Sequence, residues 1–208
     1  TIYDINPRID ATNIDSSLAI AGTAKAMGIE YLYRFRSSKF SGWLSYAYSQ
    51  IERTVDLNSD GVIWDEQEIY PAKYNKPHSF NGLVSYEINE KYTAGLTVSY
   101  GSRQTYTPVI GKVHQTNAEA YGSLENSYSN FGNIFGAKNS SRYPSYFRID
   151  ISLARKMNVF GINSELKFQI VNLTDYYNVL LYNWNHESSP SKVQAYSMFP
   201  RIFTFGWE

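Results

Sequence analysis

Side chains of alternating polarity recur in seven stretches of this chain. Between residues 92 and 101, even-numbered positions carry Tyr, Ala, Leu, Val and Tyr, whereas odd-numbered positions carry mainly Thr, Gly and Ser. Successive side chains of a β-strand point to opposite faces, so this period of two predicts strands with one apolar and one polar face. The seven stretches are 28–36, 40–50, 79–88, 92–101, 145–156, 165–172 and 201–208. An eighth strand is expected from 1–5 or 178–184.

The connections between these stretches alternate strictly in length. Short turns are expected near 37–40, 89–91 and 158–163, and long polar loops near 53–77, 103–144 and 183–194. In an antiparallel meander, this alternation places all short turns at one rim and all long loops at the other. Outer-membrane β-barrels have this layout, with short periplasmic turns and longer extracellular loops.

Three features favour a membrane barrel over a soluble sandwich. Several stretches reach ten residues, which a tilted membrane crossing requires. Tyrosines lie toward the ends of the apolar faces, as in an interfacial aromatic girdle, at Tyr46, Tyr48, Tyr86, Tyr92 and Tyr100. The opposite faces are small or polar, which suits a watery lumen. The chain also contains 19 Tyr, while charged residues make up only 18%. The predicted fold is all-β, an antiparallel up-and-down transmembrane β-barrel.

Several segments, in this order, resemble one family. They are "GTAKAMGIEYLYRF", "GWLSYAYSQIER", "YPAKYNKPHSFNGLVSY", "RYPSYFRIDISLARK", "FQIVNLTDYYNVLLYNW" and "FPRIFTFGWE". From about residue 22 to the end, the chain resembles the C-terminal barrel portion of TonB-dependent outer-membrane receptors of the Bacteroidetes type. One departure is Asn75, which stands where the family usually has Asp.

This resemblance implies a bacterial outer-membrane protein that imports a scarce nutrient: a siderophore, cobalamin, an oligosaccharide or a peptide. The family's barrel has 22 strands, so residues 1–208 are expected to supply about 7–8 of them, as a fragment without the N-terminal plug. The implied partners are outer-membrane lipid, the plug, TonB and the imported ligand. Two alternatives stay open: a small complete outer-membrane barrel, acting as adhesin or enzyme, and a soluble β protein that binds carbohydrate.

The loop at 56–68, "DLNSDGVIWDEQE", resembles a calcium-binding loop, with acidic or amide side chains at alternate positions before a glycine. The candidate Ca²⁺ ligands are Asp56, Asn58, Asp60, Val62 and Glu68. Position twelve is Gln67, where the pattern demands a bidentate Glu. The same residues are also typical of a polar turn at Asp60 and Gly61, or of an acidic loop that contacts substrate.

Two further sets of residues are candidates for function. Arg148 and Asp150 share the polar side of one stretch and are expected to face the lumen, as an ion pair or a plug contact. The residues expected to contact ligand from the extracellular loops are Tyr121, Tyr128, Phe131 and His78. No arrangement of catalytic residues stands out, so no enzyme activity is expected. The 19 basic residues balance 19 acidic ones, which gives no argument for nucleic-acid binding.

Overall fold

The structure is a computed structural model that describes residues 2–5, 19–55, 69–114, 131–185 and 191–208. Its main sheet contains β1 (Ile2–Ile5), β2 (Ala19–Arg36), β3 (Phe40–Val55), β4 (Ile69–Pro71), β5 (His78–Glu87), β6 (Tyr92–Gly101), β11 (Tyr146–Val159), β12 (Ile162–Val171) and β15 (Ile202–Trp207). The described ranges hold no helix with the length and apolar character of a membrane span. The prediction of an all-β, antiparallel fold is confirmed.

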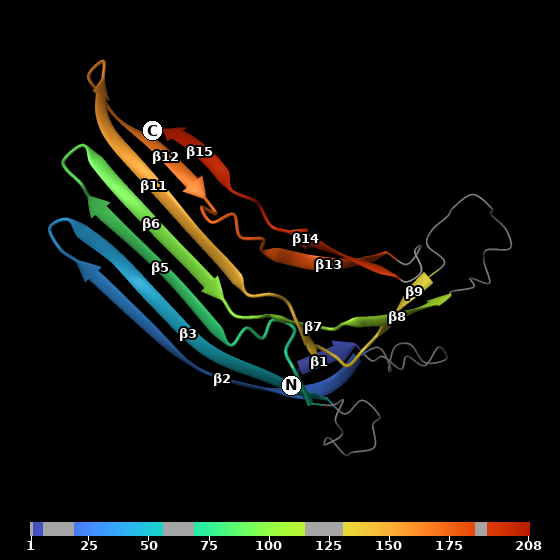
Figure 1. The fold of residues 1–208 in the computed structure, drawn as a ribbon. Helices are drawn as coiled ribbons and strands as arrows, with labels where there is room; N and C mark the ends of the chain where they lie inside the picture. Colours follow the sequence, from blue (N-terminus) through green and yellow to red (C-terminus); the bar gives the residue numbers. More distant parts are fainter. Residues whose placement is uncertain (1, 6–18, 56–68, 115–130, 186–190) are drawn as a thin grey trace.

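The main sheet is a meander in which strands follow one another in chain order (Figure 1). Its order is β1-β2-β3-β5-β6-β11-β12-β15, with every neighbouring pair antiparallel and β4 paired to the end of β3. All seven predicted stretches are strands of this sheet, and residues 2–5 supply the eighth. Residues 179–185 instead form β13 (Val179–Asn185), which pairs with β14 (Lys192–Ser197) in a separate hairpin.

The predicted loop at 103–144 contains more regular structure than expected. It holds β7 (Thr105–Tyr106), β8 (Val109–His114), β9 (Phe131–Phe135) and β10 (Ser141–Arg142), in the pairs β8–β9 and β7–β10. These short strands, and the β13–β14 hairpin, lie at the end of the sheet that carries the long connections (Figure 1). We call this end the long-loop rim.

The opposite rim consists of tight turns, as the connection lengths predict. The sharpest joins β11 to β12, where Val159 pairs with Ile162 and only Phe160 and Gly161 intervene. Both residues have positive φ angles, 53° and 84°, which identify a type I′ hairpin turn. The Asn158 side chain accepts a hydrogen bond from the Gly161 N–H at 2.9 Å. The twist of such a turn matches the twist of the strands that it joins.

Strand pairing aligns the apolar sides of all seven long strands on one face of the sheet. One row contains Tyr31, Tyr46, Phe80, Tyr100 and Phe147. A second row, nearer the turns, contains Phe40, Tyr86, Ala94, Leu153, Phe168 and Phe205. The opposite face carries polar rows such as Ser45, Asn81, Ser99 and Arg148. A slip of one residue in any pairing would have broken this separation.

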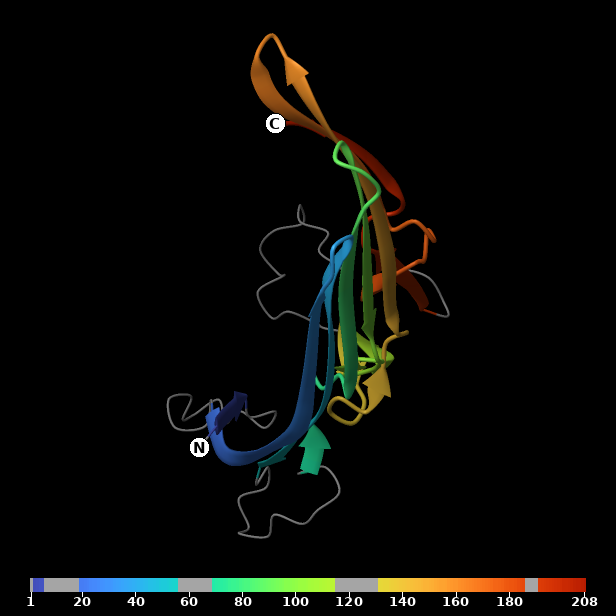
Figure 2. The ribbon, with the colours of Figure 1, turned by 90° about the vertical axis from the view of Figure 1, so that its left-hand side faces the viewer.

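The sheet is a single curved layer (Figure 2). Nothing in the described residues covers its apolar face, where Ile29 is 73% exposed, Leu96 41% and Phe205 70%. The buried side chains cluster instead toward the long-loop rim: Val55, Tyr70, Ala72, Asn75, Thr105, Asn139, Asp150, Asn172 and Asn178. Most of these are polar, and among the described residues only the Asn75 Oδ1 is a buried side-chain atom without a hydrogen-bond partner. The described chain therefore buries mainly hydrogen-bonded groups at its rim rather than an apolar core.

Candidate functional site

The long-loop rim is held together by side chains that reach across distant connections. The buried Thr105 hydroxyl donates to the Ala72 carbonyl at 2.6 Å, which joins β7 to the segment after β4. Asn139, also buried, donates from its amide to the Pro71 carbonyl at 2.8 Å. Its backbone N–H donates to the Thr107 hydroxyl at 3.0 Å. Together these bonds fix the connections from 69–77, 102–108 and 136–143 against one another.

Asn139 suits this position because its φ angle is 53°, in the left-handed region. Asparagine tolerates that region better than other residues with a side chain. Its amide also supplies one donor and one acceptor group, and both are in use: it donates to Pro71 and accepts from the Thr107 hydroxyl at 3.2 Å. A local backbone requirement and a long-range contact are therefore met by one residue.

Three tyrosines from separate parts of the chain form a cluster at this rim. The ring centroids of Tyr106 and Tyr143 are 4.4 Å apart, and those of Tyr143 and Tyr182 are 5.1 Å apart with nearly parallel planes. Tyr106 and Tyr182 complete the cluster at 5.5 Å. These distances are typical of stabilising aromatic pairs. The cluster brings the β13–β14 hairpin against β7 and the segment after β10.

The tyrosine cluster forms one wall of a cavity of about 420 Å³. Aromatic rings from β9 and β13, Phe135 and Trp184, also line the cavity, and the remaining lining residues are Thr107, Val109, Asn133, Asn139, Arg53, Lys73 and Lys138. Three of these are cationic, and no carboxylate is present among the described lining residues. A volume of several hundred Å³ with aromatic walls and a few polar groups is typical of a small-molecule site.

Burial affects the acidity of two phenols in the cluster. It raises the pKa of Tyr106, and the charge of a neighbouring Tyr182 phenolate raises it further. The pKa of Tyr143 is raised first by burial and then by charge on Tyr106 and Tyr182. Both phenols therefore remain protonated at neutral pH, so that the cluster presents hydroxyl groups and neutral ring faces.

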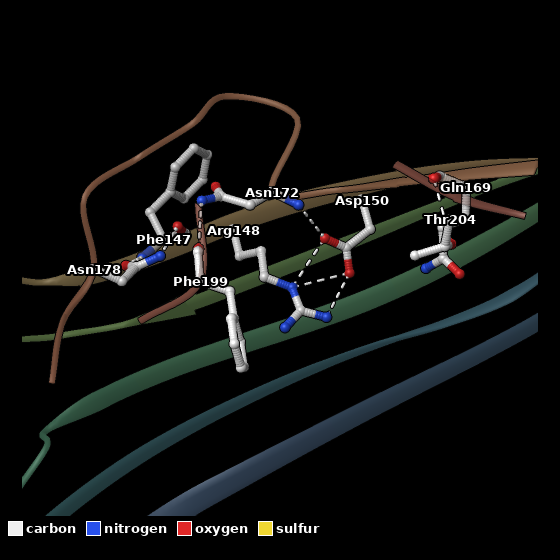
Figure 3. Close-up of polar contacts among 8 residues, drawn as sticks. All are labelled: Phe147, Arg148, Asp150, Gln169, Asn172, Asn178, Phe199 and Thr204. Carbon is white, nitrogen blue, oxygen red and sulfur yellow. Dashed lines mark hydrogen bonds and ion pairs between the residues drawn. The ribbon is translucent and has the colours of Figure 1, made fainter. Parts of the chain in front are cut away.

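A second polar site lies on the sheet itself, near the same rim (Figure 3). The Arg148 guanidinium donates to both carboxylate oxygens of Asp150, with its Nη2 at 2.6 Å from Oδ2. Asp150 is only 4% exposed and also accepts the backbone N–H of Asn172 at 2.8 Å. The carboxylate thus satisfies a side chain on its own strand and the backbone at the end of β12. Both predicted residues lie on the polar face of the sheet, and their contact with a lumen or a plug stays a prediction.

Asn172 and Asn178 continue this network into the segment after β12 (Figure 3). The Asn172 side chain, with a φ angle of 54°, donates to the carbonyls of Tyr176 and Phe199 at 3.2 and 3.3 Å. The Asn178 amide accepts from the Phe147 N–H at 2.8 Å and donates to the Phe147 carbonyl at 2.9 Å. One side chain therefore replaces a strand neighbour for β11 where β12 has ended.

The other predicted ligand residues have varied placements. His78 begins β5 on the apolar face, with Nδ1 at 2.8 Å from the Tyr46 hydroxyl and its ring 5.2 Å from Tyr48. It does not line the cavity, and a ligand contact there stays a prediction. Phe131 begins β9, where it pairs with His114.

Tyr121, Tyr128 and the whole candidate calcium loop with Asp56, Asn58, Asp60, Val62 and Glu68 lie outside the described residues. Within the part of the chain that the structure describes, no three His, Cys, Asp or Glu side chains are grouped as metal ligands. Calcium binding at 56–68 therefore stays a prediction.

The cavity residues were not identified from the sequence. Tyr106, Tyr143 and Tyr182 lie in three separate segments, and no local pattern distinguishes them from the other tyrosines. One available signal was that Tyr106 and Tyr143 both lie in the long connection predicted at 103–144, and that Tyr182 directly precedes the one predicted at 183–194. No family model, curated protein or solved structure matches this chain.

Proposed function

We propose that this chain forms part of the wall of an outer-membrane receptor that imports a nutrient and resembles the TonB-dependent family. The observation that carries the proposal is the uncovered apolar face of a single-layer sheet. In a water-soluble protein such a face would be buried against a second layer. A bilayer provides the missing apolar surroundings, and an aqueous lumen suits the polar face.

The spacing of aromatic residues supports a bilayer as the covering medium. The apolar side of β6 begins at Tyr92 and ends at Tyr100, eight residues later. At about 3.4 Å per residue these rings are roughly 27 Å apart along the strand. A tilt of about 40° reduces this to roughly 21 Å along the membrane normal, near the height of about 25 Å between aromatic girdles. Leu96 and Val98 occupy the interval between them.

The sheet is open, and closure would require further strands. In the described residues its outermost long strands are β2 and β15, with only the four-residue β1 beyond β2. A transmembrane sheet must pair all its strands, because lipid offers no hydrogen bonds to an open edge. The proposed wall therefore continues on both sides with strands of the same receptor, and the polar face encloses the plug that the resemblance implies. Arg148 and Asp150 would lie on this inner face.

Site-directed spin labelling tests the proposal, because the chain has no cysteine. Single cysteines at Leu96, Thr97 and Val98, labelled with nitroxide, would be studied in the full-length protein in phospholipid vesicles. We expect labels at 96 and 98 to collide with oxygen, which concentrates in lipid. The label at 97 should instead collide with a water-soluble nickel complex.

Two outcomes would contradict the membrane proposal. If the nickel complex reached all three labels equally, the sheet would not lie in lipid. If neither reagent reached positions 96 and 98, a protein layer would cover the apolar face. Equivalent labels at Leu153 and Ser152 on β11 should repeat the alternation, because both strands present the same face.

A further inference from the structure

We propose that the rim cavity binds an anionic solute that carries a ring, either a sugar acid or an aromatic acid. The ring would stack on the tyrosine cluster, and the acid group would pair with the lysine and arginine side chains of the lining. This proposal names the ligand class of the proposed receptor. It relies on that function only for the direction from which the solute arrives.

The aromatic part of the lining offers flat faces at several angles. Tyr143 and Tyr182 are inclined by 26°, whereas Tyr106 and Tyr182 are inclined by 58°. Trp184, two residues beyond Tyr182 on β13, also lines the cavity. Such rings can stack on planar arenes or on the apolar face of a sugar. An aliphatic ligand of the same volume would gain little from this geometry.

The charged part of the lining has a single sign. Arg53, Lys73 and Lys138 all contribute to it, and the described lining residues include no Asp or Glu. The Lys138 ammonium lies 5.0 Å from the centre of the buried Tyr70 ring, a cation–π contact that holds it at the wall. Arg53 and Lys138 also interact with other residues of the chain, and all three cations can donate charge-assisted hydrogen bonds to an acid group of a ligand. A neutral ligand could accept hydrogen bonds from these three groups but would form no ion pair with them.

The cavity is also preorganised. Asn139, which lines it, is hydrogen-bonded to Pro71 and Thr107, and Thr105 fixes β7 to Ala72. These contacts fix the backbone next to Lys73, Lys138 and Tyr106 before a ligand arrives, which reduces the entropy lost on binding. Arg53 has the same parity as Ser45 and Ser49 on β3, so the cavity continues the polar face of the sheet.

Two matched pairs of probes test the proposal by isothermal titration calorimetry on the full-length protein in detergent. The first pair is digalacturonate and galactobiose, and the second is 2-naphthoate and 2-naphthamide. In at least one pair, we expect the acid to bind about tenfold more tightly than its neutral counterpart. That ratio is typical of one charge-assisted hydrogen bond. Whichever pair binds shows whether the ligand of the cavity is a sugar acid or an aromatic acid. Absence of binding by all four, or equal affinities within each pair, would overturn the proposal.

Variants of two exposed lysines in the connection between β4 and β5 separate a specific site from general electrostatic attraction. Lys73→Gln removes a lining cation, whereas Lys76→Gln removes one that does not line the cavity. We expect Lys73→Gln to weaken binding of the acid severalfold and leave the neutral probe unchanged, and Lys76→Gln to change neither. Equal effects of the two variants would contradict a site at this cavity.

Tyr143→Leu tests the ring contact, because it removes the central ring and keeps an apolar side chain. It should weaken both members of the binding pair. Unchanged affinity would exclude stacking on the cluster. These measurements need no bilayer, so their failure is distinguishable from a failure of the membrane proposal, which the spin labels test independently.

Discussion

The main sheet and the long-loop rim of this molecule are stabilised in different ways. Because the sheet is proposed to form a membrane wall, we call it the wall below. The wall exposes its large apolar side chains and pairs its strands in a regular register, so its stability depends on the medium against which it lies. The rim buries polar side chains and hydrogen-bonds them to backbone groups of distant connections. The comparison teaches that alternation specifies the wall, whereas individual long-range contacts specify the rim. Each prediction below tests one side of this difference.

The largest effect is expected at the centre of the wall. Leu96→Arg places a charge on the apolar face, and in a bilayer it should reduce the free energy of unfolding by about 2–4 kcal/mol. Thr97→Arg is the matched control, because it is adjacent in sequence and lies on the polar face. It should cost less than Leu96→Arg, because the new guanidinium lies on the polar face opposite the Asp150 carboxylate. Urea unfolding of the protein in phospholipid vesicles measures both.

Leu96→Arg and Thr97→Arg together are also the most direct test of the proposed difference between the sheet and the rim. Equal stabilities for the two variants would mean that the faces of β6 do not differ in environment. A greater loss for Thr97→Arg would reverse the assignment of lipid and lumen. Either result would remove the reason for treating the sheet as a membrane wall.

The second effect concerns Asp150, where the wall meets the rim network. Asp150→Ala leaves the Asn172 N–H and the Arg148 guanidinium without their carboxylate acceptor. Because an unsatisfied buried donor is costly, we expect a loss of about 1–3 kcal/mol. Ser152→Ala, on the same face two residues along, should cost about 0.5 kcal/mol or less. Urea unfolding in detergent measures both, and equal costs would show that Asp150 is no anchor.

Much of the wall could be predicted from the sequence because its signals are local. Period-two alternation identifies each long strand, and connection lengths identify the two rims. The ion pair of Arg148 and Asp150 was also accessible, since residues two apart on a strand share a face. The contact of Asp150 with the Asn172 backbone was not, because it depends on where β12 ends in space.

The rim could not be predicted because its contacts join residues that are far apart in sequence. Thr105 reaches Ala72 across 33 positions, and Asn139 reaches Pro71 across 68. Neither contact leaves a periodic trace, and the segment around 103–144 has the composition of an exposed loop. Its short strands pair only because the connections converge at one end of the sheet.

The third effect tests the positive φ angle of Asn172, a residue that is 1% exposed. Asn172→Gly keeps the left-handed backbone available but removes the hydrogen bonds to Tyr176 and Phe199. Asn172→Ala removes the same bonds, and its Cβ also strains the left-handed backbone. It should therefore be less stable than the glycine variant by about 1 kcal/mol. Urea unfolding in detergent measures the difference. An alanine variant as stable as the glycine variant would show that the backbone at this position does not need a positive φ.

The smallest effect is expected from the tyrosine cluster at high pH. Burial raises the pKa of Tyr106 above its ordinary value, so the unfolded chain releases this proton at lower pH than the folded protein does. The cluster's contribution to the free energy of unfolding is therefore complete below about pH 10 and declines as pH rises through the folded pKa.

Tyr106→Phe has no proton to lose, so its urea midpoint should fall less between pH 9 and pH 11 than that of the unaltered protein. Tyr74→Phe, at a rim tyrosine that is 71% exposed, serves as control and should retain the full decline. Because charge on Tyr106 also raises the pKa of Tyr143, the difference between Tyr106→Phe and the other two proteins reports the cluster as a whole. An identical decline for Tyr106→Phe would mean that the phenol is as well solvated in the folded rim as in the unfolded chain. The rim would then lack the half-buried ring cluster that distinguishes it from the main sheet.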